Sequence, residues 1–241
     1  MSYKLNLITL TRKYPGGKIT RFKSRSNNAL DACLAIYEYL RGVTVARQFV
    51  NKHYYDFLSC PANNLVVEVG GSNKLHESLG FSNNIKSLDI VPSSDIDICE
   101  DVENLSFSDA SIDRFVCISV LEHVQNPGKA ISEMLRCLKP GGEIILSVPW
   151  MFEMHMEPRD YYRYTLEGIV LLSSGARIVK VFYSNGYLGL LAHFLQKSIV
   201  LRYLMGSLFY VCSWIEKPSA RFASQVHLIL EKPSEAPQSG K

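Results

Sequence analysis

Residues 155–165 bring a potential base, two acids, two cations and three tyrosines into eleven consecutive positions. They follow a predicted strand and precede a predicted helix that begins near Leu166, so we expect a loop, the kind of segment that carries function on a rigid scaffold. An imidazole group titrates near neutral pH and can take a proton from a hydroxyl group. His155 is therefore the first candidate for a general base, and His123, just after an earlier predicted strand, is the second.

The same loop offers groups that can hold a polar acceptor. Asp160 can orient His155 or the acceptor. Tyr161, Tyr162 and Arg163 supply aromatic surface and charge-assisted hydrogen bonds. The alternative is a structural plug, in which Asp160 pairs with Arg163 and the tyrosines pack under the sheet. We favour the catalytic role for Asp160 and the acceptor-binding role for the other three residues.

Acids and glycines also stand where several predicted strands end. Ligands of open α/β sheets bind at the carboxyl ends of the strands. An ionised carboxylate accepts hydrogen bonds from a vicinal diol, and glycine lets the backbone approach a ligand closely. A single Asp at such a place is often only a turn or helix cap, but acids at three successive strand exits favour one binding site. The candidates are Glu68, Gly70, Gly71, Asp89, Asp101 and Val102.

The elements that must position these residues alternate along the chain. From Leu65 onward, short apolar runs are separated by helical stretches, which is typical of βαβ units and a parallel sheet. The segment Lys139-Pro140-Gly141-Gly142 predicts a sharp turn into the fifth strand, because proline presets φ at the second turn position and glycine accepts a positive φ at the third. Seven strands are predicted, near residues 65–69, 86–90, 95–98, 114–119, 143–148, 176–183 and 225–231.

The N-terminal residues have a different pattern. Alternating polar and apolar residues on either side of Pro15-Gly16-Gly17 predict a hairpin over residues 4–23. Helices are expected within 29–41 and 43–58. The predicted division is an N-terminal extension over 1–60, a main α/β domain over 61–232 and a disordered tail over 233–241.

A hydrophobic helical insertion is expected at 187–217, inside the main domain. Lys197 and Arg202 interrupt it, so no uncharged run reaches the roughly 18–20 residues of a membrane-spanning helix. One or two helices packed into the core are the first interpretation. The second is an interfacial helix pair or groove that contacts a membrane, a lipid-linked substrate or a partner.

The net charge of +3 is unevenly distributed, since the first thirty residues hold seven Lys or Arg and no acid. A solvated basic segment is the first explanation, and contact with an anionic substrate or membrane surface is the second. The six cysteines form no CxxC pair and no zinc spacing. No secretory signal is evident, so we expect a cytoplasmic protein, with peripheral membrane contact through 187–217 left open. An organelle transit peptide ranks second, because Pro15-Gly16-Gly17 interrupts an amphipathic helix there.

The pieces between residues 65 and 150, taken in order, resemble the class I S-adenosylmethionine-dependent methyltransferases, and their type 11 group in particular. The resemblance implies a Rossmann-like α/β fold, with a seven-stranded mostly parallel sheet, helices on both faces and a C-terminal antiparallel hairpin. It implies S-adenosyl-L-methionine as the cofactor. Glu68 and the two glycines would meet its amino-acid end, Asp89 its ribose hydroxyls, and Asp101 with the Val102 backbone N–H its adenine.

The sequence departs from that family's pattern at four positions. Ser72 and Lys74 replace the second and third glycines of the first loop, and Ser106 replaces a common proline. Some relatives have a metal site that begins with an acid where this chain has Ser119, so no metal is expected. The first loop also lacks the Gly-x-Gly-x-x-Gly pattern of nicotinamide dinucleotide sites, which disfavours that cofactor.

Residues 155–165 resemble the corresponding loop of methyltransferases found with glycan and cell-envelope biosynthesis. The predicted function is therefore O-methylation of a sugar, a glycoconjugate or another small polar acceptor. The alternative is a non-catalytic binding or scaffold protein with the methyltransferase fold. A nucleic-acid substrate is not expected, because the chain has no recognised nucleic-acid module.

Overall fold

The computed structural model describes most of the chain from residue 64 onward and a few earlier residues. The predicted hairpin at 4–23 lies outside the described residues, as do Ser72, Lys74 and 156–158. The described residues within 36–40 and at 53–58 are helical. The described residues are 36–37, 39–40, 53–59, 64–71, 76, 81, 84–155, 159–218 and 220–234.

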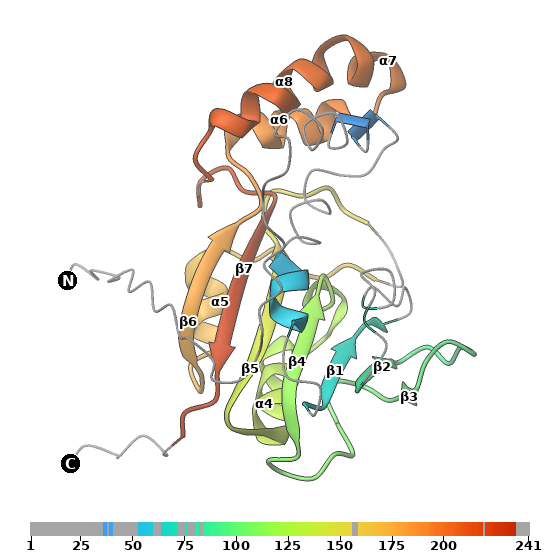
Figure 1. Ribbon diagram of the computed structural model, residues 1–241, viewed down its shortest axis with the longest axis vertical. Coiled ribbons are helices and arrows are strands. Elements are labelled where there is room, and N and C mark those ends of the chain that lie inside the picture. Colours follow the sequence, from blue (N-terminus) through green and yellow to red (C-terminus); the bar gives the residue numbers. More distant parts are fainter. Residues whose placement is uncertain are drawn as a thin grey trace, which may run out of the picture.

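Among the described residues, seven strands form one sheet in the order β3-β2-β1-β4-β5-β7-β6 (Figure 1). The strands from β3 to β5 are parallel to their neighbours, whereas β7 is antiparallel to both β5 and β6. The predicted fold class, a mostly parallel sheet with a C-terminal antiparallel pair, is confirmed. The strands are β1 (Val66–Val69), β2 (Ile85–Asp89), β3 (Ile98–Cys99), β4 (Ile112–Ile118), β5 (Leu138–Pro149), β6 (Arg177–Tyr183) and β7 (Gln225–Glu231).

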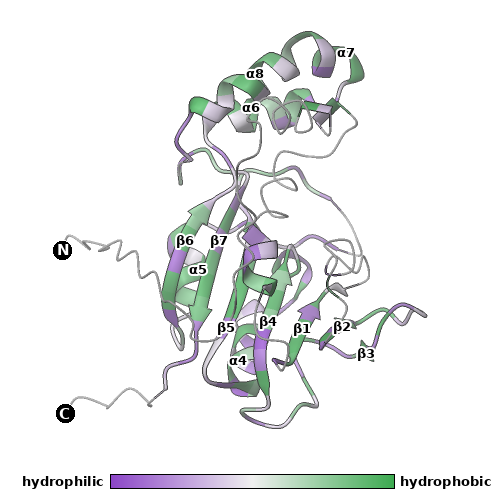
Figure 2. Cartoon of the chain, viewed as in Figure 1, coloured by the Kyte–Doolittle hydropathy of each residue, from purple (hydrophilic) through white to green (hydrophobic). Residues whose placement is uncertain are grey.

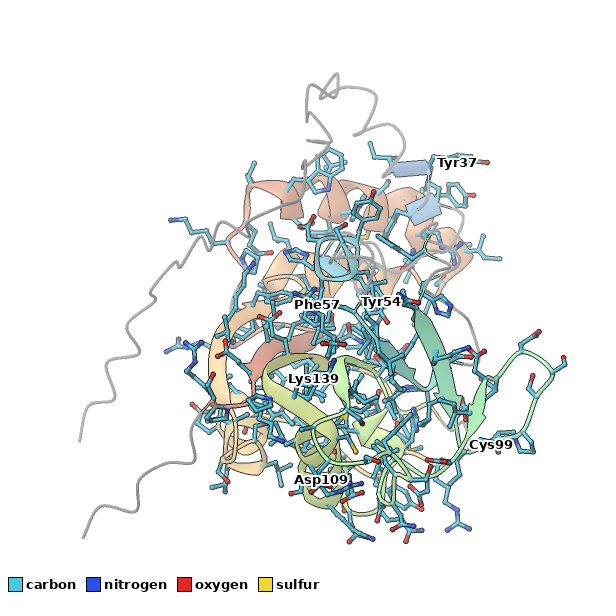
Figure 3. All side chains as sticks on the ribbon, turned by 60° about the horizontal axis from the view of Figure 1, so that its bottom comes forward. Tyr37, Tyr54, Phe57, Cys99, Asp109 and Lys139 are labelled. Carbon is cyan, nitrogen blue, oxygen red and sulfur yellow. The ribbon has the colours of Figure 1, made fainter. Side chains whose placement is uncertain are left out.

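Helices cover both faces of the sheet, as expected for strands that are buried along most of their length. α4 (Pro127–Cys137) buries Ala130, Ile131, Met134 and Cys137 in one core, which also holds residues of α5 (Leu166–Leu172). The spacing of these buried residues places them on one face of a helix. On the other face of the sheet, Tyr54 and Phe57, labelled in Figure 3, pack from the segment 53–58 in a second core.

The third strand differs from its prediction. It was expected at 95–98, but only Ile98–Cys99 pairs with β2. The Asp97 carboxylate accepts hydrogen bonds from the Ser87 backbone N–H and hydroxyl, each at 2.9 Å, and these bonds hold its pKa below the usual range. This side-chain bond to the neighbouring strand takes the place of the regular strand ladder there, so the strand begins only after Asp97.

The turn before the fifth strand has the predicted conformation. Gly141 has a φ of +75°, a conformation that glycine adopts without strain. The strand itself begins earlier than predicted, because Leu138 already pairs with Ile112 of β4. The register then shifts between Ile112 and Arg114, so the turn lies inside the strand as an irregularity.

The helical layer between β6 and β7 comprises α6 (Tyr187–Leu195), α7 (Ile199–Leu201), a π-helical turn (Arg202–Gly206), α8 (Ser207–Cys212) and a short 3₁₀ turn (Ser213–Ile215). It lies beyond the end of the sheet toward which β1 and β4 point (Figure 1). Its helices are coloured mostly as hydrophobic in Figure 2. Within the described part of the chain, every helix is too short or too polar to span a membrane.

Candidate active site

The carboxyl ends of the central parallel strands bring the predicted site residues to one edge of the sheet. Val69 of β1 lies beside Leu88 of β2 and Cys117 of β4, and Cys117 lies beside Leu146 of β5. The loops that follow these four strands therefore leave the sheet at the same edge, the usual ligand edge of an open α/β sheet. The ends of these strands and the loops after them carry Glu68, the two glycines, Asp89 and both candidate histidines, whereas Asp101 and Val102 follow the neighbouring strand β3.

Gly70 and Gly71 form a tight turn at the end of β1. Gly70 has a φ of +70°, and a Cβ atom on it would come within 2.5 Å of Val120 Cγ2. A Cβ atom on Gly71 would come within 2.8 Å of Ser87 Cβ. The two glycines are thus required by their neighbours on β2 and after β4, and they keep the backbone of this loop close to the sheet edge.

Glu68 is buried beneath this loop. Its side chain pairs with the Nδ1 atom of His76, and the same carboxylate oxygen lies 3.4 Å from the His76 backbone N. The contact joins the end of β1 to a residue eight positions later. Its contact with the cofactor stays a prediction.

Asp89 and Asp101 each begin a short turn after their strands. Asp89 Oδ1 accepts a hydrogen bond from the Val91 backbone N at 3.0 Å, and Asp101 Oδ1 accepts one from the Glu103 backbone N at 2.9 Å. Asp101 is exposed, whereas its neighbour Val102 is buried. Each carboxylate is held by its own backbone and so has a fixed direction at the strand exit.

Ser106, which stands where the family commonly has proline, has a defined role. Both its backbone N–H and its hydroxyl donate to the carboxylate of Glu100, the former at 3.0 Å. A proline has no N–H to donate, so the replacement adds a link that proline would not make. The turn is held further by Glu103, which accepts two hydrogen bonds from Asn126 at the start of α4.

Glu122, His123 and His155 form a cluster between the exits of β4 and β5. The two imidazole rings meet edge to face, with centroids 5.0 Å apart, and His155 Nε2 lies 3.8 Å from Glu122 Oε1. The Nδ1 atom of His123 bonds to the Arg159 carbonyl oxygen. The structure therefore brings both candidate bases together, and adds an acid that the sequence did not single out.

Glu122 is completely buried, and neither carboxylate oxygen meets a hydrogen-bond partner within the described residues. Loss of hydration raises its pKa to about 8, with a smaller upward contribution from the Asp160 carboxylate and an opposing one from Arg163. At neutral pH Glu122 is mainly protonated. It thus offers the site a neutral carboxyl group next to two imidazoles.

Asp160 holds the backbone of His155. Its carboxylate accepts a hydrogen bond from the His155 backbone N at 2.9 Å and lies 3.5 Å from His155 Nδ1. The bidentate pair with Arg163 keeps the pKa of Asp160 well below its usual range. Asp160 is therefore ionised and holds the His155 backbone, and its part in catalysis stays a prediction.

Arg163 holds this loop together through its guanidinium group. Its two Nη atoms bond Asp160 and the carbonyl oxygens of Tyr162 and Glu153, and its Nε bonds the carbonyl of Phe152. All five N–H groups of a guanidinium are thereby engaged within the loop. The pairing of Asp160 with Arg163, which the sequence offered as the structural alternative, is present, and an acceptor contact by Arg163 stays a prediction.

The tyrosines dock the loop onto the exit of β4. The buried Tyr164 hydroxyl donates to the Leu121 carbonyl at 2.7 Å, and the Tyr162 hydroxyl donates to the Gln125 carbonyl at 2.9 Å. Tyr161 and Tyr162 are 40% and 38% exposed, so their rings remain accessible to a ligand. Tyr162 and Tyr164 line an open hollow of about 520 Å³ beside the start of α4.

A second ion-pair group connects the loop to the helical layer. The Glu153 carboxylate bonds His193 Nε2 at 2.8 Å and pairs with Lys197, and both partners belong to or follow α6. These bonds outweigh partial burial and hold the pKa of Glu153 at about 2, so it is ionised at any ordinary pH. The residue two positions before His155 is therefore fixed to the layer.

The residues that sequence reasoning missed are Glu122, Glu153 and His193. Glu122 could have been identified from the sequence, because it directly precedes the candidate base His123 and follows an apolar run. Glu153 and His193 lie forty positions apart and carry no pattern that would pair them.

Comparisons with known proteins address the fold and one segment. Residues 71–146, from the glycine loop into β5, match a protein family described as a methyltransferase domain. No curated protein matches the chain.

Three solved structures share the fold at low identity. One chain of the complex between the Haloferax volcanii Trm112 methyltransferase activator and a methyltransferase has a TM-score of 0.55 at 15% identity, over 86% of this chain and 99% of that chain. The Burkholderia thailandensis 1,6-didemethyltoxoflavin-N1-methyltransferase, solved with its substrate and S-adenosylhomocysteine, has a TM-score of 0.53 at 12% identity, over 85% and 88%. An S-adenosylmethionine-dependent methyltransferase from Thermotoga maritima has a TM-score of 0.52 at 17% identity, over 82% and 96%.

These similarities establish the coarse assignment. The chain has the fold of the S-adenosylmethionine-dependent methyltransferases, and residues 71–146 are similar to a methyltransferase domain.

Proposed function

We propose that this protein transfers a methyl group from S-adenosylmethionine to an oxygen atom of a sugar, a glycoconjugate or another small polar acceptor. The observation that supports cofactor binding is the set of acids Glu68, Asp89 and Asp101 at three successive strand exits beside the glycine turn. Carboxylates suit a cofactor with an ammonium group, a ribose diol and an exocyclic amine. When bound, S-adenosylmethionine supplies a methyl carbon already activated for displacement.

The chain's own residues would orient the acceptor and remove its proton. Methyl transfer to an activated carbon needs mainly alignment, and a hydroxyl acceptor also needs a base. His155 has a backbone fixed by Asp160 and an Nε2 atom turned toward the Glu122 carboxyl. We assign His155 as the base, with His123 as the alternative. Tyr161 and Tyr162, whose rings are partly exposed on the same loop, would contact the acceptor.

A non-catalytic binding or scaffold role is the second candidate. The replacement of two family glycines by Ser72 and Lys74 favours it, because both side chains add bulk to the loop expected to face the cofactor. Isothermal titration calorimetry with S-adenosylmethionine and S-adenosylhomocysteine tests the proposal. Saturable binding of both ligands is expected, and the absence of binding to either would leave only the scaffold role.

Asp89→Ala should weaken S-adenosylmethionine binding by about 1.5–3 kcal/mol, the contribution of hydrogen bonds to a charged group. Asp89→Asn should lose less, because its amide oxygen can still accept the bond from the Val91 backbone N. Asp95→Ala, which changes an exposed acid in the next turn, is the matched control and should bind as the parent does. An Asp89→Ala affinity within twofold of the parent would remove Asp89 from the ribose site.

Dialysis against a chelator should leave the initial rate of methyl transfer unchanged. Glu122, His123 and His155 each place one potential ligand atom within 4.8 Å of the others, so the arrangement could accept a cation. However, the hydroxyl of Ser119, at the position of the first acid in metal-binding relatives, accepts a hydrogen bond from Gln225 Nε2 at 2.9 Å. A rate that falls after dialysis and returns with Zn²⁺, Mn²⁺ or Mg²⁺ would show that the cluster binds metal.

A further inference from the structure

The outer side of the helical layer exposes an unusual amount of apolar surface. Leu204, Leu208 and Ile215 are 72%, 62% and 88% exposed. Together with Val211 they follow one another at steps of four, three and four residues, so they form one stripe along α8 and the turns on either side of it. Ile199 and Val200 in α7 are 70% and 63% exposed. Other exposed apolar residues, such as Leu171, occur singly or in pairs, whereas this group gathers on neighbouring turns of one helical layer, as is typical of an interaction site.

The opposite side of the same helix is already packed. Tyr210 stacks on Tyr39, with ring centroids 4.6 Å apart and planes within 6°. The Tyr39 hydroxyl donates to the Ala192 carbonyl of α6 at 2.8 Å, and a Cβ atom on Gly206 would collide with that hydroxyl. The layer therefore has its own small core between α6 and α8, and the outer stripe is not part of it.

The charges around the stripe are mostly positive. Between residues 187 and 222 the sequence has four Lys or Arg and a single acid, Glu216. Lys197 pairs with Glu153, and Arg202 donates to backbone carbonyls of the layer, so the positive charge that remains is that of Lys217 and Arg221. Glu216 accepts hydrogen bonds from the backbone N of Leu188 and Gly189 at the start of α6, so its charge is used inside the layer. Lys217 and Arg221 are exposed in the segment that follows the last turn of the layer. Basic residues beside an apolar face complement an anionic lipid surface.

Two aromatic residues lie along one border of the stripe. Tyr203 and Trp214 are 58% and 45% exposed, and they lie between the outer stripe and the packed side of the helix. Amphipathic rings at such a border are typical of residues at the level of lipid headgroups.

We propose that the outer face of the helical layer, formed by Ile199, Val200, Leu204, Leu208, Val211 and Ile215, binds the surface of an anionic lipid bilayer. The layer lies beyond the carboxyl edge of the sheet and is joined to the loop of His155 through Glu153 and His193. Binding through this face would therefore hold the candidate active site near the membrane. The inference does not depend on methyl transfer, because the surface binds with or without the cofactor.

The experiment is flotation of the full-length, cofactor-free protein with vesicles of phosphatidylcholine, with and without phosphatidylglycerol. The parent should float with the anionic vesicles and bind the neutral ones more weakly, and high salt should reduce the difference. The variant Leu204→Ser/Leu208→Ser should bind at least about tenfold more weakly, since each buried leucine accounts for about a tenfold change. Lys217→Gln, which removes one positive charge, should weaken binding to anionic vesicles about fivefold and leave binding to neutral vesicles unaffected.

Leu171→Ser is the matched control, because Leu171 is 75% exposed on α5 and lies outside the helical layer. It should bind vesicles as the parent does. The substituted leucines are all exposed, so the variants should unfold at the parent's temperature. Absence of flotation of the parent with anionic vesicles would overturn the proposal, as would equal losses in Leu171→Ser and the double variant. Sedimentation velocity tests a third outcome that would overturn the proposal. In that case the parent would be a dimer that does not bind vesicles, and the double variant would be a monomer.

Discussion

His155→Ala should lower kcat for methyl transfer by roughly 10²–10⁴-fold, the share that a general acid–base group usually contributes. The reason is geometric. The backbone of His155 is fixed by Asp160, and its Nε2 atom lies 3.8 Å from the carboxyl of Glu122 at the exit of β4. Removing the imidazole removes the proton acceptor but none of the acids at the exits of β1 and β2. Once an acceptor is found, the decrease in kcat is measured by discontinuous assays with labelled S-adenosylmethionine.

Three further variants test this assignment. The affinity for S-adenosylmethionine should be unchanged in His155→Ala, and His53→Ala, at an imidazole stacked on Phe182, should retain kcat. Asp160→Asn should give a smaller loss than His155→Ala, because the amide still accepts from the His155 backbone but no longer carries a charge. If His155→Ala keeps its rate and His123→Ala loses it, the base is His123. If both variants keep the rate, the acceptor needs no base and the oxygen-acceptor proposal fails.

Much of the fold could be predicted because its signals are local. The strands at 66–69, 85–89, 177–183 and 225–231 match their predictions closely, since each is an apolar run bounded by turn residues. The third strand could not be placed, because its start depends on the bond between Asp97 and Ser87 of the neighbouring strand. A bond across strands has no signal in the local pattern.

The candidate site divides in the same way. The acids and glycines at strand exits could be predicted, because topology alone brings strand ends to one edge. The burial of Glu122 could not, since it depends on the docking of Tyr161 and Tyr164 onto the exit of β4. The five hydrogen bonds of Arg163 likewise exist only in the folded loop. The sequence therefore identified the residue but could not decide whether it holds the loop together or contacts the acceptor.

The orientation of the helical layer could not be predicted from its mostly apolar sequence. The stretch 187–217 is apolar on all sides, so its pattern does not say which side faces the protein. Tyr39 settles the inner side by stacking on Tyr210, a contact over more than 150 positions of sequence. Such a partner can be identified only from the folded chain.

Glu122→Gln should make the protein more stable than the parent at pH 8, by about 2–4 kcal/mol, with a much smaller difference at pH 5. Glu122 has a pKa of about 8 in the folded protein, against 4.5 for an ordinary glutamate. Between these values the folded parent keeps a proton that the unfolded chain releases, so its free energy of unfolding falls as the pH rises. Each unit of pKa difference corresponds to about 1.4 kcal/mol of unfolding free energy. We expect less than the full amount, because small movements of the protein can bring water to the ionised carboxylate. Glutamine has nearly the same shape and does not titrate.

Urea unfolding of parent and variant at several pH values between 5 and 8.5 measures the difference. The titratable and charged groups near Glu122 include Cys117, His123, His155, Asp160, Arg163 and Tyr164. They are the same in both proteins, so their titration largely cancels in the comparison. Glu167→Gln, at an exposed acid on α5, is the control and should give a difference that does not vary with pH. If the curves of Glu122→Gln and the parent run parallel, Glu122 is ionised in the folded protein at neutral pH. Its charge would then have to be balanced by a protonated histidine or a bound cation, because a buried carboxylate without a partner would cost several kcal/mol.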